Sequence, residues 1–349
     1  MQRFWRLLDV FALLFTMAAC QSTQTQSAKD LKIASGSGYA PQVREYFVAA
    51  EDVSWNYAPS GKNLLHVADG LGVWGKPLVY KKTRYIEYTD ESFKTLKPQD
   101  PSLGILGPVI RGVVGDTLRV HFLNRSKVPL NMHPHGVLYD KDNEGAHYGT
   151  EPHKGQHVAP GESYTYTWSV PERAGPGPRD GSSVFWLYHS HDHTGDGLYK
   201  GLMGPIVIVD PRFATADAKP NDIDRELFNL FMIFNENSEG KEDEKHLKHA
   251  INGYIFANLP GLTMHAHDRV RWYLAAMGNE VDLHTPHWHG ETVLAQGLRK
   301  DVVELLPASM MAVDMKAENV GTWMYHCHVV DHVKAGMSAL YTILPAKTP

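Results

Sequence analysis

Residues 326–337 read His-Cys-His-Val-Val-Asp-His-Val-Lys-Ala-Gly-Met, and this run contains several side chains that commonly bind metals. It contains Cys327, one of only two cysteines, with His332 five positions later and Met337 ten positions later. One thiolate, imidazole nitrogens and a weak thioether are the ligands of a blue-copper electron-transfer site. The histidines flanking Cys327 should point away from its side chain, since neighbouring side chains on a strand face opposite ways. They are therefore free to hold a second metal centre.

Histidine is unusually frequent, with 20 among 349 residues. Random placement at this frequency gives about one His-x-His pair. The sequence has six, at positions 133/135, 189/191, 191/193, 265/267, 287/289 and 326/328. This excess indicates metal binding, and a net charge of −5 does not suggest a nucleic-acid partner.

The region around the opening run is repeated earlier in the chain. Residues 185–191 (Phe-Trp-Leu-Tyr-His-Ser-His) match residues 322–328 (Thr-Trp-Met-Tyr-His-Cys-His). Further upstream, residues 131–136 (Asn-Met-His-Pro-His-Gly) match residues 285–290 (Thr-Pro-His-Trp-His-Gly). The same two motifs in the same order indicate two copies of one domain.

Both copies contain short runs rich in Val, Ile, Tyr, Phe and Trp, separated by Gly, Pro, Asn and Asp; residues 163–170 and 204–209 are examples. Such runs are typical of an antiparallel β-sandwich, and no long amphipathic helix stands out. We expect an all-β protein with domain 1 at 40–210 and domain 2 at 226–346. The stretch 211–224, rich in Pro, Ala and Asp, is the expected linker.

The two copies differ at the blue-copper positions. The domain 2 residues His284, Cys327, His332 and Met337 correspond in domain 1 to Leu130, Ser190, Gly195 and Lys200. Both copies nevertheless keep two His-x-His pairs, so two separate kinds of metal site are expected. Four histidines from each domain, placed face to face, could hold three copper ions with open positions for dioxygen.

These motifs resemble those of the multicopper oxidases. The likeness covers roughly residues 43–344, and residues 44–59, 103–110, 133–142 and 249–253 are similar to the ceruloplasmin and hephaestin branch. Those relatives have six such domains, so this chain is more similar to the two-domain members of the family. The resemblance implies two cupredoxin-like Greek-key β-sandwiches and an enzyme that couples one-electron oxidation of a reductant to four-electron reduction of dioxygen to water.

The resemblance also implies four copper ions per chain. Type 1 copper would be bound by His284, Cys327, His332 and Met337. Type 2 copper would be bound by His133 and His287. The type 3 pair would be bound by His135, His189, His191, His289, His326 and His328.

The sequence is compatible with more than one reductant. In ceruloplasmin, ferrous iron is oxidised at an acidic site beside type 1 copper, and the matching residues here are Glu244, His249 and Asp331. Carboxylate oxygens would hold Fe(II) and favour Fe(III). Alternatively, Glu244 belongs to a solvated charge run, and Asp331 accepts a hydrogen bond from a ligand histidine. Laccase-like oxidation of phenols or aromatic amines is an equal alternative.

The sequence leaves three other functions to consider. Oxidation of Cu(I) for copper tolerance is suggested by Met310 and Met311, although paired methionines more often pack in a core. A copper nitrite reductase shares the fold, but its type 1 copper lies in domain 1 and it lacks the eight histidines. A non-catalytic copper-binding module would have lost ligands, whereas all twelve are present here.

The resemblance further suggests a homotrimer. In a six-domain relative the cluster closes a ring between the last domain and the first. With two domains per chain, three chains would close a comparable ring, and domain 2 of one chain would meet domain 1 of the next.

The N-terminus has the pattern of an export signal. Arg3 and Arg6 precede an apolar run from Val10 to Ala19 that is too short to span a membrane. Met17-Ala-Ala-Cys20 resembles a bacterial lipobox, so we expect a signal peptide at 1–19 and a lipid anchor on Cys20. Residues 20–39 form a polar tether. This pattern predicts an exported protein that is either periplasmic or a lipoprotein anchored to a membrane, the outer membrane included.

Overall fold

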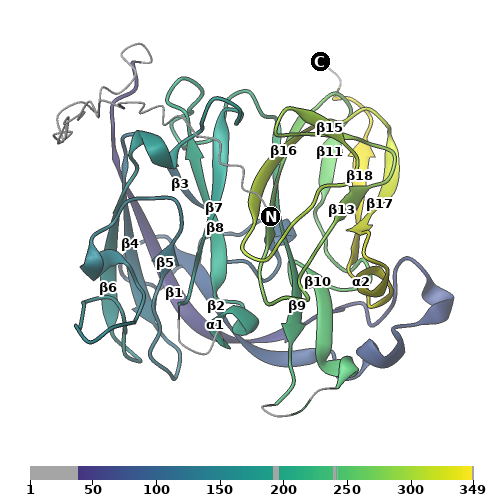
Figure 1. Cartoon of the computed structure of the whole chain (residues 1–349), viewed down its shortest axis with the longest axis horizontal. Helices are drawn as coiled ribbons and strands as arrows, with labels where there is room; N and C mark the ends of the chain where they lie inside the picture. Colours follow the sequence, from purple (N-terminus) through teal and green to yellow (C-terminus); the bar gives the residue numbers. More distant parts are fainter. Residues whose placement is uncertain (1–37, 192–195, 239–240, 242, 348–349) are drawn as a thin grey trace, which may run out of the picture. The chain divides into compact units, whose positions relative to one another are not determined.

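A computed structural model describes residues 38–191, 196–238, 241 and 243–347 of the chain. The predicted signal peptide, the candidate lipid anchor Cys20 and the predicted tether as far as residue 37 lie outside the described residues. Strands make up nearly all of the regular structure, which confirms the all-β prediction (Figure 1).

The first half of the chain forms two four-stranded sheets. One has the strand order β2-β1-β4-β6 and consists of β1 (Val43–Asn56), β2 (Val79–Tyr88), β4 (Thr117–Asn124) and β6 (Ser163–Ser169). The other has the order β3-β8-β7-β5 and consists of β3 (Ile110–Val113), β5 (His133–Pro134), β7 (Ser183–His189) and β8 (Met203–Val209). Buried side chains of both sheets, including Phe122, Trp168 and Ile206, share one core, as in a β-sandwich.

The second half also forms two sheets. A six-stranded sheet, β10-β9-β12-β16-β14-β15, consists of β9 (Arg225–Asn235), β10 (Leu247–Ile251), β12 (Arg269–Ala276), β14 (Val293–Ala295), β15 (Leu298–Lys300) and β16 (Met310–Lys316). A four-stranded sheet, β11-β18-β17-β13, consists of β11 (Thr263–His265), β13 (Pro286–Trp288), β17 (Gly321–Cys327) and β18 (Ser338–Leu344). Trp272 and Tyr325 come from different sheets and meet in the core between them.

Helices are short and lie in the connections. The two α-helices are α1 (Asp196–Lys200) and α2 (Val330–Lys334). The 3-10 helices are η1 (Val67–Asp69), η2 (Gly72–Gly75), η3 (Pro101–Leu103), η4 (Lys141–Asn143), η5 (Glu172–Ala174) and η6 (Glu244–His246). Of these, α1, α2, η2 and η6 carry residues that bear on the candidate site.

The sequence patterns of β4 and β8 explain their different positions. In β4 apolar and polar residues alternate, and Leu118, Val120 and Phe122 are buried while the residues between them are partly exposed. This is the period-2 pattern of a strand with one face in a core. All seven residues of β8 are buried. Its Ile206 packs in the domain 1 core, whereas Val207 packs in a second core shared with β9 and β12, so both faces of β8 are covered.

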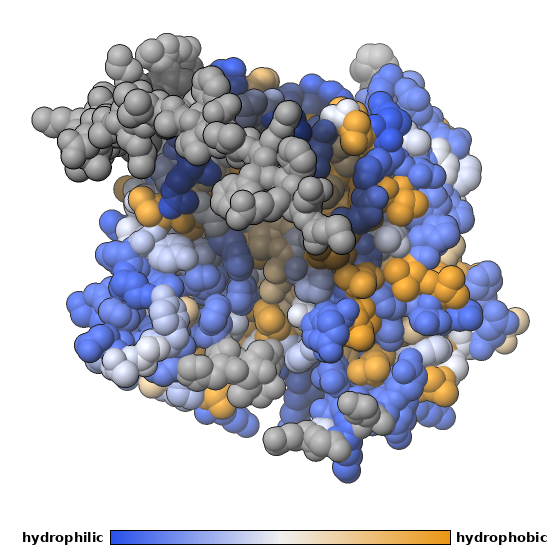
Figure 2. Space-filling model, in the orientation of Figure 1, coloured by the Kyte–Doolittle hydropathy of each residue, from blue (hydrophilic) through white to orange (hydrophobic). Residues whose placement is uncertain are grey.

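Apolar side chains are sparse on the face in Figure 2. Its visible residues are mostly hydrophilic, and the apolar ones form small separate groups, chiefly over the strands of domain 2. None of the helices in the described part of the chain has the length and apolar character needed to cross a membrane.

Candidate metal centres

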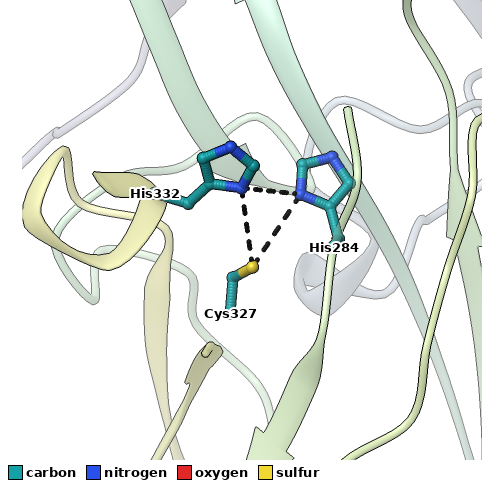
Figure 3. Close-up of side chains that lie close together, drawn as sticks. All are labelled: His284, Cys327 and His332. Atoms are coloured by element: carbon teal, nitrogen blue, oxygen red, sulfur yellow. Dashed lines mark hydrogen bonds between the residues drawn. The ribbon is translucent and has the colours of Figure 1, made fainter. Parts of the chain in front are cut away.

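Three side chains of domain 2 converge on one point: His284, Cys327 and His332 (Figure 3). The Nδ1 atoms of His284 and His332 are 3.2 Å apart, and Cys327 Sγ lies 3.9 Å from the first and 3.6 Å from the second. A point equidistant from these three atoms is ~2.1 Å from each, within the range of about 2.0–2.3 Å for imidazole and thiolate ligands of zinc, an ion of similar size. Two imidazoles and one thiolate form the trigonal donor set typical of blue copper. The donor atoms therefore fit a copper ion.

The backbone holds these residues and Met337 together. Cys327 ends β17, and His332 lies on α2 immediately after it. The Cys327 N–H donates to the Met337 carbonyl (3.1 Å), and the Met337 N–H donates to the His332 carbonyl (2.9 Å). Cys327 and Met337 are both fully buried in the domain 2 core. The fourth residue of the predicted set is thus tied directly to two of the others.

Burial favours the uncharged forms of Cys327 and His332. It raises the pKa of the Cys327 thiol, although the Thr285 N–H that donates to Sγ at 3.3 Å opposes this effect. Burial, with His284 nearby, lowers the pKa of His332 to about 4. A neutral imidazole has a lone pair for a metal, and binding to the sulfur would release the thiol proton.

Four further histidines form a second cluster in domain 2: His287, His289, His326 and His328. Their rings contact one another, and the Nε2 atoms of His289 and His326 are 3.1 Å apart. The pairing of β13 with β17 places His287 opposite His326. His287 Nδ1 donates to the Asp301 carbonyl (2.9 Å), and His326 Nδ1 donates to the Cys327 carbonyl (2.8 Å). These bonds leave the Nε2 atoms available to a metal.

Domain 1 repeats the same arrangement. Its set is His133, His135, His189 and His191. The Nε2 atoms of His135 and His189 are 3.0 Å apart, and His133 lies opposite His189 in the β5–β7 pair. His133 Nδ1 donates to the Glu144 carbonyl (2.7 Å), and His189 Nδ1 donates to the Ser190 carbonyl (2.9 Å). The two halves of the chain therefore present equivalent four-histidine sets.

Burial favours the neutral form of the more deeply placed histidines of these sets. It lowers the pKa of His135 to about 4, of His189 to about 3 and of His326 to about 4, and neighbouring histidines lower each value further. Neutral imidazoles are the form that binds a transition metal. Both sets thus fit copper in their donor chemistry.

The two sets occupy separate places within the chain. Among the described residues, the histidine ring contacts of each set stay within its own domain. His191, His289 and His328 are exposed, and His287 and His289 line an open hollow with Asp301 and Trp323. The four-histidine set of domain 2 is therefore open on one side.

Domain 1 has no counterpart of the Cys327 site among its described residues. Leu130 is buried in the domain 1 core, and Ser190 Oγ donates to Asn131 Oδ1 (3.4 Å) where domain 2 has its thiol. Gly195 lies outside the described residues. Without a thiolate, this position lacks the soft ligand that a blue-copper site requires.

The predicted acidic residues line one cavity of about 600 Å³ that reaches His332. Its lining includes Glu244, His249 and Asp331. His249 is 6% exposed, its ring centroid lies 5.2 Å from that of His332, and its Nε2 lies 3.9 Å from Glu244 Oε1. Both ring nitrogens of His249 are buried without a hydrogen-bond partner among the described residues, and burial lowers its pKa to about 3. An unpartnered, neutral imidazole facing a carboxylate can accept a cation.

Sequence reasoning missed several residues of this region. Val73, Trp74 and Tyr199 belong to domain 1 yet line the same cavity. No local signal in the sequence links them to domain 2. Asp282, which contacts His284, was also missed, although an acid two residues before a predicted ligand on an extended segment lies on the same side as that ligand.

Met310 and Met311 both border one cavity of about 490 Å³ but pack against different cores. They are consecutive residues of β16, and their side chains point to opposite faces. Met310 packs against the core shared by the two domains, and Met311 packs against the domain 2 core. Their pairing is explained by packing.

Comparison with known proteins agrees with this geometry. Two family models, each described as multicopper oxidase, match residues 103–212 and 226–347. The chain is 39% identical to hephaestin of Mus musculus over 345 residues, covering 86% of this chain and 29% of the relative. It is 36% identical to Ferroxidase HEPHL1 of Homo sapiens over 339 residues (86% and 29%) and 36% identical to human ceruloplasmin over 345 residues (86% and 32%). The chain thus spans about a third or less of these relatives.

Solved structures share the fold over most of both chains. A multicopper oxidase crystal structure matches with a TM-score of 0.61 at 19% identity, covering 86% of this chain and 89% of that one. A blue copper oxidase from Nitrosomonas europaea matches with a TM-score of 0.60 at 18% identity (87% and 86%). These matches confirm the predicted cupredoxin-like fold. Taken with the two family models and the sequence relatives, they show that the chain belongs to the multicopper oxidase family.

Proposed function

We propose that the chain is an oxidase that takes electrons one at a time from Fe(II) and delivers them to dioxygen. The observation that carries this proposal is the cavity in which Glu244, His249 and Asp331 lie beside His332. Hard carboxylate oxygens bind iron and favour its ferric form. Relatives named ferroxidase and ceruloplasmin support the same substrate.

Twelve residues would hold four copper ions per chain. His284, Cys327, His332 and Met337 would hold type 1 copper, and His133 and His287 type 2 copper. The type 3 pair would be held by His135, His189, His191, His289, His326 and His328. Bound copper would supply the one-electron steps and the four-electron reduction of dioxygen to two waters.

The chain's own residues set the route of the electron. Iron held by Glu244 and Asp331 would lie against His332, whose ring lines the cavity. Cys327 then links the two centres, because His326 and His328 are its covalent neighbours. The buried, neutral imidazoles exclude water and competing protons from the donor atoms.

The test compares oxygen consumption with Fe(II) and with a phenol as reductant. We expect Glu244→Gln/Asp331→Asn to lose most Fe(II) turnover and to keep phenol turnover. Asp243→Asn is the matched control, because Asp243 caps the same turn, is exposed and does not line the cavity. Equal loss of both activities, or retention of both, would contradict an iron site at these carboxylates.

Phenol or aromatic amine oxidation is the second candidate. The cavity lining also includes Val73, Trp74 and Val281, and Tyr199 contributes another ring. An apolar and aromatic wall beside a few polar groups suits a small aromatic ligand. Rapid phenol turnover with negligible Fe(II) turnover in the unmodified protein would favour this candidate.

We also propose a homotrimer with clusters shared between chains. The four-histidine set of domain 2 is open on one side, and four histidines are too few to hold three copper ions. Cyclic closure of three chains would bring domain 2 of one chain, from 226 to 346, against domain 1 of the next, from 40 to 210. A monomer in calibrated light scattering that still reduces dioxygen would exclude this assembly.

Export and lipid anchoring complete the proposal. Cleavage after residue 19 and lipidation of Cys20 would place the enzyme in the periplasm on a membrane, with residues 20–39 as its tether. Mass spectrometry of the mature protein tests this directly. We expect a lipid-modified Cys20 at the N-terminus and, in Cys20→Ala, a shift from the membrane to the soluble fraction.

A further inference from the structure

Asp282 is a completely buried carboxylate beside the Cys327 cluster, with an exposed fraction of 0%. Its Oδ1 accepts the Ile233 N–H (2.7 Å), and its Oδ2 accepts the Asn279 N–H (3.0 Å). Oδ1 also lies 3.2 Å from His284 Nε2. Both oxygens therefore act as acceptors, which is the role of an ionised carboxylate.

The loop before Asp282 is shaped around this carboxylate. Gly278 has a φ of +122°, and a Cβ atom there would lie 2.0 Å from Asp282 Oδ2. A side chain at 278 would thus displace the carboxylate, and only glycine combines this φ with the close approach. In the described part of the chain, His284 is the one basic side chain within ion-pair distance of Asp282. Burying a carboxylate without a fully charged cation beside it is costly. The Asp282 carboxylate therefore needs specific hydrogen-bond donors to compensate this cost.

The geometry fixes which nitrogen of His284 carries the proton. A neutral imidazole has one donor nitrogen and one acceptor nitrogen. Because both Asp282 oxygens accept, Nε2 must donate to Oδ1. Nδ1 then keeps its lone pair, and it is this atom that faces Cys327 Sγ and His332 Nδ1.

We infer that Asp282 is a positioning residue for type 1 copper. It locks His284 in the Nε2–H tautomer, fixes the plane of the ring and places a negative charge one ring away from the metal, which favours Cu(II) over Cu(I). This inference rests on the type 1 site of the proposed function. The hydrogen bond to a ligand histidine that the sequence left open for Asp331 is made here by Asp282, whereas Asp331 is exposed.

A residue that lines the substrate cavity also holds the Asp282 carboxylate in place. Asn279 lines the cavity, its Nδ2 donates to Tyr199 Oη (3.4 Å), and its backbone N–H holds Asp282. The same short loop therefore shapes the substrate cavity and orients a copper ligand.

The test replaces Asp282 by asparagine, which keeps the shape and removes the charge. An amide group cannot accept on both sides, so one of the three N–H partners loses its acceptor. We expect Asp282→Asn to bind Cu(II) at the type 1 site ~10–100-fold more weakly in a competition assay with a chelator. We also expect a higher type 1 reduction potential with the blue absorption retained. The matched control is Glu280→Gln, which removes one charge from an exposed position of the same loop and should change neither quantity.

The outcomes separate this inference from the proposed function. If the unmodified protein gains no blue absorption with copper, the type 1 assignment fails. If it is blue and Asp282→Asn matches Glu280→Gln in affinity and potential, the role of Asp282 is refuted. Should Asp282→Asn not fold, nitrogen-15 NMR of histidine-labelled metal-free protein decides: a proton on His284 Nε2 supports the inference, and a proton on Nδ1 overturns it.

Discussion

His326 Nδ1 lies 2.8 Å from the carbonyl oxygen of Cys327, the next residue in the chain. The side chain of Cys327 faces His284 and His332, whereas the ring of His326 faces His289. Neighbouring side chains on β17 point in opposite directions, so Cys327 belongs to the cysteine-containing centre and His326 to the histidine cluster. A covalent segment and a hydrogen bond join the two centres at this point.

Replacing Cys327 by serine should separate the two centres in function. We expect Cys327→Ser to lose the blue absorption and oxygen consumption, because a hydroxyl is a poor copper ligand. The eight histidines are unchanged, so about three of four copper ions per chain should remain by metal analysis. Ser190, the counterpart in domain 1, offers the control Ser190→Ala, which should keep its colour. Full activity of Cys327→Ser would contradict electron transfer through this residue.

Mixing two inactive variants tests whether the histidine sets of different chains meet. We expect His133→Ala/His135→Ala and His287→Ala/His289→Ala to be inactive alone. After joint unfolding and reassembly in equal amounts, about a quarter of the interfaces in a cyclic trimer would pair an intact domain 2 with an intact domain 1. Oxygen consumption should therefore return to roughly a quarter of the unmodified level. No recovery in reassembled trimers would show that each site is built within one chain.

The buried ion pair of Lys82 and Glu236 should stabilise the contact between β2 and β9. Lys82 Nζ donates to Glu236 Oε1 and to the Tyr199 carbonyl, and Tyr57 Oη donates to the same carboxylate (2.5 Å). Only 1% of the Lys82 side chain is exposed. We expect Glu236→Gln to lower the free energy of unfolding by about 3 kcal/mol, because it leaves a buried cation unpaired.

Denaturant unfolding measures this effect, with Glu304→Gln as its control. The Glu304 side chain is 69% exposed in its pair with Lys300, so its loss should cost less than about 1 kcal/mol. The double variant Lys82→Met/Glu236→Met should recover much of the lost stability. Equal effects of Glu236→Gln and Glu304→Gln would contradict a structural role for the buried pair.

The metal-free protein should lose stability as the pH falls below about 6.5. Burial lowers the pKa of His189 and His249 to about 3 and of His326 and His332 to about 4. The unfolded chain binds protons near pH 6.5, whereas the folded chain resists them until pH 3–4, so protonation favours unfolding throughout this window. The total loss is on the order of several kcal/mol. Urea unfolding of the metal-free protein at pH 7.5 and pH 5 checks it, and a flat profile would show that these histidines titrate normally.

Much of the fold and the donor grouping follows from local sequence. Alternating or continuous apolar runs located β6 and β8, because side-chain period and burial are local properties of a strand. His332 and Met337 follow Cys327 closely in the chain, so a single turn, α2, suffices to bring them to it. Such features need no knowledge of the rest of the fold.

Residues that approach from the other domain could not be predicted in this way. Trp74 and Tyr199 lie far from Glu244 in sequence, and only the packing of the two domains brings them to one cavity. Asp282 was close to a predicted ligand, but its burial depends on the Gly278 turn and the Ile233 N–H. In both cases the position of the residue depends on contacts between segments that are far apart in the sequence.

The core shared by β8, β9 and β12 makes the two copies interdependent. Phe228, Leu230 and Phe234 are at most 5% exposed, and Val207 of β8 packs in the same core. An isolated second copy would present this apolar surface to water and would tend to aggregate. Domain 2, which carries the thiolate, therefore depends on domain 1 to cover this apolar surface, although the blue-copper ligands all come from domain 2 itself.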